Sequence, residues 1–156
     1  IRLLVSNILK DQNYLVRTAA NYDQAIFEIN KKLPDLAIVD IKLDKPDKDG
    51  IDLLKIITKK SKTTPVIMIS GHATVKIAIE AIKIGAYEFI EKPFSREKIL
   101  NYVNRGLESS ELKKEKALIE NYKYVHYLKD LEILIFLSSD ERDLKLNKKI
   151  SHKYQK

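Results

Sequence analysis

The sequence predicts an α/β fold in which helices cover both faces of a parallel sheet, a doubly wound architecture. Two short apolar runs, Leu36–Asp40 and Val66–Ser70, have the length and composition of strands buried on both faces. Segments with apolar residues at helical spacing flank both runs. Strands that alternate with helices of this length form right-handed βαβ units, and such units build a parallel sheet.

The other elements follow from the same periodicities. Strands are expected over Tyr14–Ala20 and Tyr87–Ile90, and helices over Ile1–Leu9, from Asn21 to Leu33, from Gly50, over Thr74–Ile84 and from Ser95. Asn21 and Ser95 are predicted N-caps, and Gly85 is a predicted left-handed C-cap. We therefore expect an α/β domain over 1–107, a charged linker helix over 108–127, and a tail of unknown structure over 128–156.

Composition excludes several classes of function. The chain has no cysteine, its three histidines lie far apart, and no apolar run approaches the ~18 residues of a membrane helix. With no signal peptide at its start, a cytoplasmic location is the default expectation. The net charge is +7, and residues 142–156 hold six basic residues and one acid. No helix-turn-helix pattern accompanies this charge, so we expect only weak, salt-dependent DNA binding without sequence specificity.

Polar residues stand at the ends of three predicted strands: Asp40, Ser70 and Lys92. Parallel strands bring their carboxyl ends to one edge of the sheet, where ligands bind in open α/β folds. A carboxylate, a hydroxyl and an ammonium at one edge suit phosphoryl transfer. The carboxylate would be the nucleophile, and the other two groups would hold phosphoryl oxygens.

The motifs that contain these residues are specific in combination. They are IVDIKL around Asp40, the pair Asp49-Gly50, PVIMISGHAT over 65–74 and GAYEFIEKPF over 85–94. Through them the chain resembles the receiver domain of bacterial two-component response regulators, and within that family the NtrC/NtrX-like branch. The resemblance implies a flavodoxin-like (CheY-like) sheet with strand order 2-1-3-4-5.

The resemblance also implies roles for individual residues. Asp40 would be the phosphoacceptor for a sensor histidine kinase, with Ser70 and Lys92 as phosphate-binding residues. Phe89 would be the switch aromatic, and a cis peptide bond would precede Pro93. The Asp40 carboxylate and the Lys42 backbone carbonyl would be Mg²⁺ ligands. The implied function is phosphorelay signalling in the regulation of transcription, and not enzymatic activity.

The chain departs from the receiver pattern at both ends. The pattern opens with a strand that ends in an acid pair for Mg²⁺, whereas this sequence starts inside the first helix. We therefore expect poor Mg²⁺ binding and slow phosphorylation, because two protein ligands hold Mg²⁺ weakly. Tyr14–Ala20 should have no neighbouring strand, which leaves an exposed apolar edge and predicts poor folding or aggregation. No G-x-x-x-x-G-K loop of an ATPase domain follows.

Two alternatives remain open from the sequence alone. One is a receiver-like interaction module that is never phosphorylated, which the missing acid pair favours. The other is a small Asp-dependent phosphotransferase, although a second acid beside Asp40 and a nucleotide loop are both lacking. The helix over 108–127 could support a homodimer, because four apolar residues are spaced to form a seam: Leu112, Ile119, Tyr122 and Val125.

Overall fold

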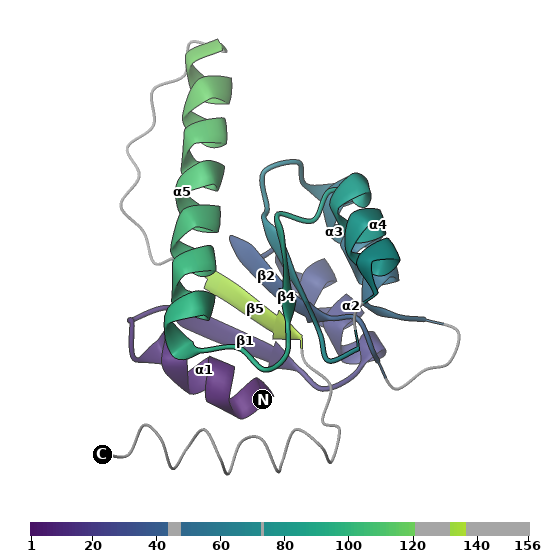
Figure 1. Cartoon of the computed structure of the whole chain (residues 1–156). Coiled ribbons are helices and arrows are strands. Elements are labelled where there is room, and N and C mark those ends of the chain that lie inside the picture. The colour runs from purple at the N-terminus through teal and green to yellow at the C-terminus, as the bar shows by residue number, and fades with distance from the viewer. Residues whose placement is uncertain (44–47, 73, 121–131, 137–156) are drawn as a thin grey trace.

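A five-stranded, all-parallel sheet forms the centre of the molecule, with the strand order β1-β5-β2-β3-β4 (Figure 1). The computed structural model of the chain describes residues 1–43, 48–72, 74–120 and 132–136. The strands are β1 (Leu15–Ala19), β2 (Leu36–Asp40), β3 (Val66–Ser70), β4 (Glu88–Glu91) and β5 (Glu132–Phe136). The predicted doubly wound α/β class is confirmed.

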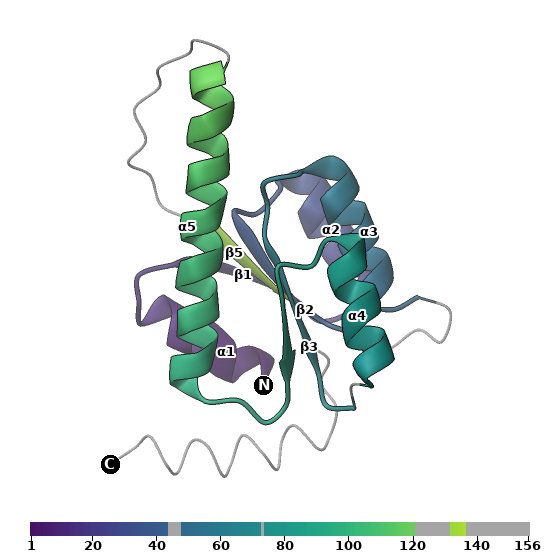
Figure 2. The same cartoon turned by 45° about the horizontal axis from the view of Figure 1, so that its top comes forward.

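Helices cover the two faces of the sheet in separate layers (Figure 2). They are α1 (Arg2–Lys10), α2 (Tyr22–Lys31), α3 (Gly50–Lys60), α4 (Val75–Ile84) and α5 (Arg96–Glu120). Helices α1 and α5 pack on one face, where they form one cluster of buried apolar side chains with the sheet. Helices α2, α3 and α4 pack on the other face and share a second cluster.

The helix boundaries follow the capping residues in the sequence. The Asn21 side chain accepts a hydrogen bond from the Gln24 N–H, and the Ser95 hydroxyl accepts one from the Lys98 N–H. Helix α4 ends at Gly85, whose φ of 124° is a conformation that a side chain would disfavour. These local signals place the helices within one or two residues of the predicted positions.

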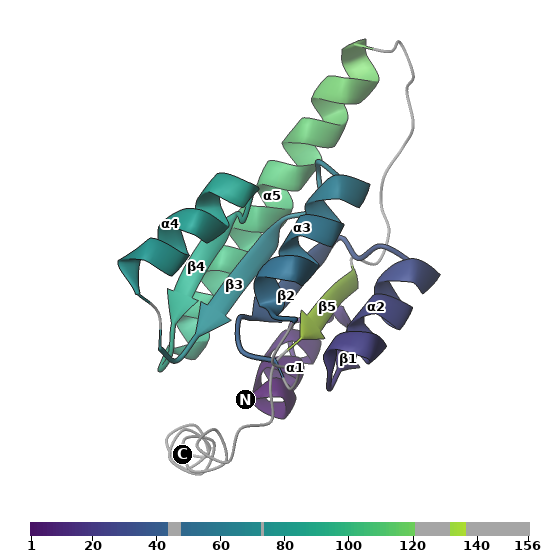
Figure 3. The same ribbon diagram turned by 90° about the vertical axis from the view of Figure 1, so that its right-hand side faces the viewer.

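The expectation that Tyr14–Ala20 has no neighbouring strand is wrong, because β5 fills the place between β1 and β2 (Figure 3). Strand β5 pairs with β1 from Leu15↔Glu132 to Ala19↔Phe136, and with β2 from Leu36↔Ile133 to Val39↔Phe136. The sheet therefore has an uninterrupted hydrogen-bonded ladder from β1 to β4. The predicted instability, which rested on an open edge beside β1, loses its basis.

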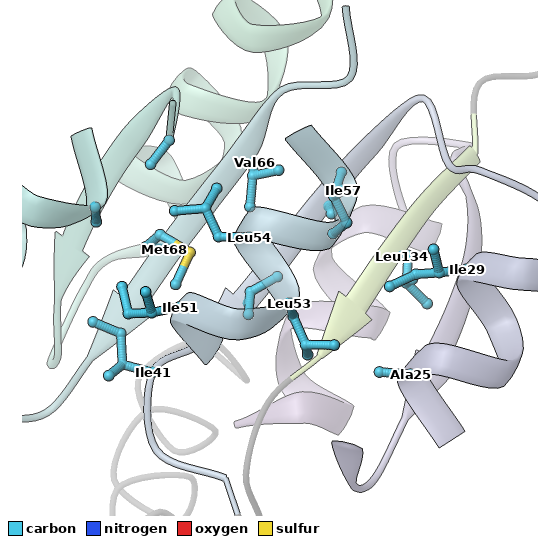
Figure 4. Close-up of a cluster of buried hydrophobic side chains, with 14 of the residues drawn as sticks. Ala25, Ile29, Ile41, Ile51, Leu53, Leu54, Ile57, Val66, Met68 and Leu134 are labelled. Atoms are coloured by element: carbon cyan, nitrogen blue, oxygen red, sulfur yellow. The ribbon is translucent and has the colours of Figure 1, made fainter. Parts of the chain in front are cut away.

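Side chains of β5 enter both apolar layers, as strand alternation requires. Ile133 is fully buried in the cluster formed with α1 and α5. Leu134 is buried on the other face, between Ile29 of α2 and Leu53 of α3 in the cluster of Figure 4. A shift of one residue in register would exchange these two faces, so the two apolar layers fix the position of β5.

Polar contacts hold the first residue of β5. The Glu132 carboxylate pairs with Arg17 Nε at 2.7 Å and with Lys32 Nζ at 3.0 Å. Arg17 is held in turn by Glu28 at 2.7 Å. The Glu132 backbone N–H donates to Asp35 Oδ2, and the Asp35 N–H donates to the Glu132 carbonyl, both at 2.8 Å. Groups from β1, α2 and the turn before β2 therefore converge on the start of β5.

The last helix extends well beyond the sheet. It runs without interruption through 108–120 of the predicted linker helix, while 121–127 lie outside the described residues. Of the predicted tail over 128–156, the structure describes only β5. Lys114 Nζ lies 3.5 Å from Asp35 Oδ1, so α5 contacts the same turn that binds β5. Within the described ranges, no helix is long and apolar enough to cross a membrane.

Replacing Glu132 by Gln tests the polar contacts at the start of β5. The change keeps the shape of the side chain but removes its charge, and the Glu132 and Arg17 side chains are only 12% and 17% exposed. We expect E132Q to lower the free energy of unfolding by about 1–2 kcal/mol in urea denaturation. The control is E108Q, an exposed glutamate on α5, which should change it by less than about 0.5 kcal/mol. Equal effects of the two changes would contradict this role for Glu132.

Candidate phosphoryl-transfer site

Three neighbouring strands deliver the predicted site residues to one edge of the sheet. Asp40 is the last residue of β2, Ser70 is the last residue of β3, and Lys92 directly follows β4. The pairing of β2 with β3 and of β3 with β4 aligns these strand ends. Buried apolar residues precede Asp40 and Ser70, whereas Lys92 follows the exposed Glu91.

A direct ion pair joins Asp40 and Lys92. Lys92 Nζ donates to Asp40 Oδ2 at 2.7 Å, and the side chains are only 11% and 3% exposed. The other carboxylate oxygen, Oδ1, accepts a hydrogen bond from the Lys42 N–H at 3.2 Å. Because both groups are buried, each charge is stabilised by the opposite charge of its partner. Removing one side chain of the pair would leave the other charge in the interior without this partner. The site therefore holds a buried carboxylate beside a fixed cation.

Ser70 is positioned by the backbone around it. Its side chain is almost fully buried, and its hydroxyl oxygen accepts a hydrogen bond from the His72 N–H at 3.2 Å. Its carbonyl accepts a hydrogen bond from the Lys92 N–H at 2.8 Å. This bond ties the end of β3 to the residue that carries the ammonium, so Ser70 and Lys92 are placed by the same ladder.

Gly50 brings the start of α3 against the backbone of Asp40. The Gly50 N–H donates to the Ile41 carbonyl at 2.9 Å, and a side chain at Gly50 would overlap the Asp40 carbonyl oxygen. Asp49 caps α3 by accepting from the N–H groups of Ile51 and Asp52, in a reciprocal capping box with Asp52. A glycine at this position is thus required by close backbone approach.

The remaining predicted features lie on β4 and just after it. Phe89 is half-buried, opposite Met68 of β3, and packs against the cluster under α2, α3 and α4. The Lys92–Pro93 peptide bond is cis, as the resemblance implied.

Comparison with known proteins agrees with the fold. Residues 1–104 match the family described as response regulator receiver domain. The nitrogen assimilation regulatory protein NtrX of Azorhizobium caulinodans is 44% identical over 112 residues, which cover 72% of this chain and 25% of that protein. The chain therefore belongs to the response regulator receiver domain family, with an NtrX-like sequence. It spans about a quarter of the length of this curated relative.

Solved structures give the same family. The receiver domain of NtrX from Brucella abortus is 43% identical, with a TM-score of 0.63 over 67% of this chain and 88% of that one. A response regulator from Burkholderia pseudomallei, solved with a phosphorylated aspartic acid, calcium ion and citrate, is 25% identical, with a TM-score of 0.59. The alignment covers 74% of this chain and 68% of that one.

Receiver domains of this family bind Mg²⁺, and the residues at this edge match that requirement only in part. The described segments contain no group of three or more acidic, histidine or cysteine side chains that could hold a metal ion. Of the two ligands that the resemblance implies, the Asp40 carboxylate already binds Lys92, and the other is the Lys42 backbone carbonyl. Since Mg²⁺ prefers several oxygen ligands, the described residues do not make a complete site by themselves.

Two features of the site were not predicted from the sequence. The motif Asp49-Gly50 indicated the start of a helix, but the contact of Gly50 with the Asp40 backbone depends on the tertiary path of the chain. The sequence predicts that the strand beside β2 lies before Ile1, whereas in the structure Glu132–Phe136 occupies this place. Residues 131–137, LEILIFL, form a dense apolar run in the predicted tail, but the sequence does not indicate the strands with which this run pairs.

Because Gly50 lies close to the Asp40 backbone and Gly71 has more space, alanine should cost more stability at position 50 than at position 71. We expect G50A to lower the free energy of unfolding by about 2 kcal/mol or more, because the new methyl group must displace the Asp40 backbone. In G71A the methyl group would lie 3.7 Å from Lys92 Cδ, an ordinary contact, so the cost should stay below about 1 kcal/mol. Urea denaturation measures both. A G50A protein as stable as G71A would contradict the packing around Asp40.

A double-mutant cycle tests the buried ion pair. K92M should lower the free energy of unfolding by about 3 kcal/mol, because it leaves the Asp40 carboxylate buried without its cation. Adding D40N should recover part of this loss, since the uncompensated charge is then removed. Stabilities of the single and double variants from urea denaturation give the coupling. Additive losses would show that the two groups do not depend on each other.

Proposed function

We propose that Asp40 is the phosphoacceptor of a phosphorelay receiver domain. The observation that carries this proposal is the 2.7 Å contact between Asp40 and Lys92 at the strand edge where Ser70 also ends. The family assignment and the phosphorylated aspartic acid of the Burkholderia pseudomallei relative support it.

The reaction follows from the groups at this edge. A carboxylate oxygen of Asp40 would attack the phosphorus of a phosphohistidine on a sensor histidine kinase. The P–O bond forms as the P–N bond breaks, and the histidine nitrogen takes the electron pair of that bond. Lys92 Nζ, already beside Asp40 Oδ2, would pair with a phosphoryl oxygen, and the Ser70 hydroxyl would donate to another. The result is an acyl phosphate on Asp40.

Phosphorylation would be read out through β4. When the phosphoryl group takes over Lys92 and Ser70, the ends of β3 and β4 adjust together, because the Lys92 N–H is bonded to the Ser70 carbonyl. Phe89 lies three residues before Lys92 on the same strand and is half-buried, so we assign it the switch role.

A metal ion would be held at Asp40 and at the Lys42 carbonyl, and it would neutralise charge on the phosphoryl oxygens. Because the described residues supply one carboxylate, we expect Mg²⁺ binding to be weak and phosphorylation to be slow.

Partners in trans would be a sensor histidine kinase and a second copy of the chain. The basic segment over 142–156, expected not to give specific DNA binding, lies outside the described residues.

A second candidate function is a receiver-like interaction module that is not phosphorylated. The observation that favours it is the same ion pair, since Lys92 occupies one carboxylate oxygen and weakens the nucleophile. Phosphorylation chemistry separates the two candidates.

The direct test is labelling with a small phosphodonor. We expect incubation with acetyl phosphate and Mg²⁺ to add a hydroxylamine-sensitive phosphate to Asp40, slowly, as located by mass spectrometry. D40N should abolish this label, while D11N, at an exposed aspartate, should retain it. A label on another residue that persists in D40N would overturn the assignment. Complete absence of label in the folded protein would favour the interaction module.

A further inference from the structure

A pocket lies at the amino edge of the sheet, opposite the edge that carries Asp40. Its walls are the turn between α3 and β3 (residues 61–65), the turn between α4 and β4 (residues 85–87) and residues 106–113 of α5. Helix α5 runs past this edge of the sheet, as Figure 1 shows, and so closes one side. The volume is about 360 Å³, which is in the range of small-molecule sites. We call this hollow the amino-edge pocket.

Positive charge dominates the lining of the amino-edge pocket. Lys62 and Lys113 both line it, and none of the described residues in its lining is acidic. Both lysines are exposed, and neither forms an ion pair within the described segments. An anion can therefore bind both ammonium groups without displacing a carboxylate of the protein.

The turn between α3 and β3 supplies a hydroxyl donor as well. The Ser61 oxygen accepts hydrogen bonds from the N–H groups of Thr63 at 3.3 Å and Thr64 at 3.1 Å, which occupy both of its lone pairs. Thr64 Oγ1 donates to the Pro34 carbonyl at 3.2 Å. Ser61 then donates its own proton to Thr63 Oγ1, 3.3 Å away. The Thr63 proton is left for a group outside this turn.

Ser110, on the wall that α5 forms, is the second sign of a ligand that accepts hydrogen bonds. Its side chain is 4% exposed, and within the described segments its hydroxyl has no hydrogen-bond partner. A buried hydroxyl without a partner costs free energy, because its bonds to water have been lost and not replaced. A ligand oxygen that accepts from Ser110 would remove this cost.

The ends of α3 and α4 act against an anion, because both helices end at this pocket. Each C-terminus carries a partial negative charge of about half an elementary charge. Lysines in the last turns of the two helices, Lys59, Lys60 and Lys83, compensate this charge. The full charges of Lys62 and Lys113 therefore determine that the preferred ligand is an anion.

A more apolar hollow adjoins the amino-edge pocket along α5. Its volume is about 390 Å³, and the two hollows share Tyr87, Ser109 and Lys113 in their linings. Leu112, which is 66% exposed, also lines it. The Tyr87 ring and the Leu112 side chain can contact an apolar part of a ligand whose anionic group lies beside Lys113.

We propose that the amino-edge pocket binds the phosphoryl group of a small organic phosphate, with the apolar part of that ligand against Tyr87 and Leu112. A phosphate monoester carries close to two negative charges at neutral pH, and so it matches two ammonium groups. Its three terminal oxygens can accept from donors on both walls, whereas a planar carboxylate has only two oxygens. The site lies opposite Asp40 and does not depend on phosphorylation there.

Calorimetric titration of the 156-residue chain with phenyl phosphate, in the absence of Mg²⁺, tests the proposal. We expect one saturable site with a Kd of about 1 mM or lower. Inorganic phosphate, which lacks the ring, should bind at least about fivefold more weakly. No saturable binding of phenyl phosphate up to about 10 mM would overturn the proposal. Equal affinities for the two anions would overturn the role given to Tyr87 and Leu112.

Two lysine variants locate the site. K62Q and K113Q each remove one cation from the amino-edge pocket, and each should weaken binding by at least about tenfold. The matched control is K98Q, at another exposed lysine of α5, which should weaken binding by less than about twofold. All three lysines are exposed, so the melting midpoints should stay unchanged. Equal weakening by K98Q and K113Q would show non-specific attraction to a basic protein and overturn the proposal.

S110A separates a role in binding from a role in folding. It removes the unpaired hydroxyl and favours the helix, so it should keep or raise the melting midpoint. We expect it to weaken phenyl phosphate binding by about threefold, because one donor is lost. A lower midpoint with unchanged affinity would overturn the role given to Ser110.

The D40N variant distinguishes this pocket from the phosphoryl-transfer site. It should bind phenyl phosphate as tightly as the unmodified chain, with amide chemical-shift changes centred on residues 61–65, 85–87 and 106–113. Loss of binding in D40N, or shift changes centred on Ser70 and Lys92, would place the anion at the opposite edge and overturn the proposal. Failure of acetyl phosphate to label Asp40 would leave the expected result of this titration unchanged.

Discussion

Parallel pairing of β5 with β1 on one side and β2 on the other is the interaction on which the rest of the structure depends. Without it, β1 would contact the sheet only through α1 and α2, and the apolar residues beneath both helices would lose a central neighbour. Ile133 and Leu134 connect the two layers through this one strand. Since a domain is stable by only ~5–15 kcal/mol, a central strand is a large part of what holds it together.

The functional edge depends on the same sheet. Asp40, Ser70 and Lys92 come from three successive strand ends, and Asp40 directly follows the stretch of β2 that pairs with β5. The Asp40–Lys92 ion pair is buried and short, so its geometry requires strands that do not shift relative to one another. Strand β5 secures β2 on its second edge, yet in the sequence Leu137 and Ser138 follow it, where the receiver pattern has acids.

Much of this could be predicted from the sequence, because the signals are local. Each of these signals determines structure within a few residues of itself. They are the apolar runs that end in Asp40 and Ser70, the helix caps at Asn21 and Ser95, and the glycine at position 85. The origin of the strand beside β2 could not be predicted in this way. The apolar run LEILIFL lies in the tail for which the sequence predicts no structure, and its partners are over a hundred residues away in β1 and nearly as far in β2. The pairing of Glu132 with Arg17 and the contact of Gly50 with Asp40 likewise depend on chain paths that periodicity does not encode.

The most direct measurement of the central claim is an NMR map of contacts between strands in the full-length chain. Pairing in the register described here places the backbone of Leu134 between Arg17 of β1 and Ala37 of β2. We therefore expect nuclear Overhauser contacts from Leu134 to both residues, with slow amide exchange along β5. Contacts between β1 and β2 without β5, or rapid exchange of the β5 amides, would contradict the account.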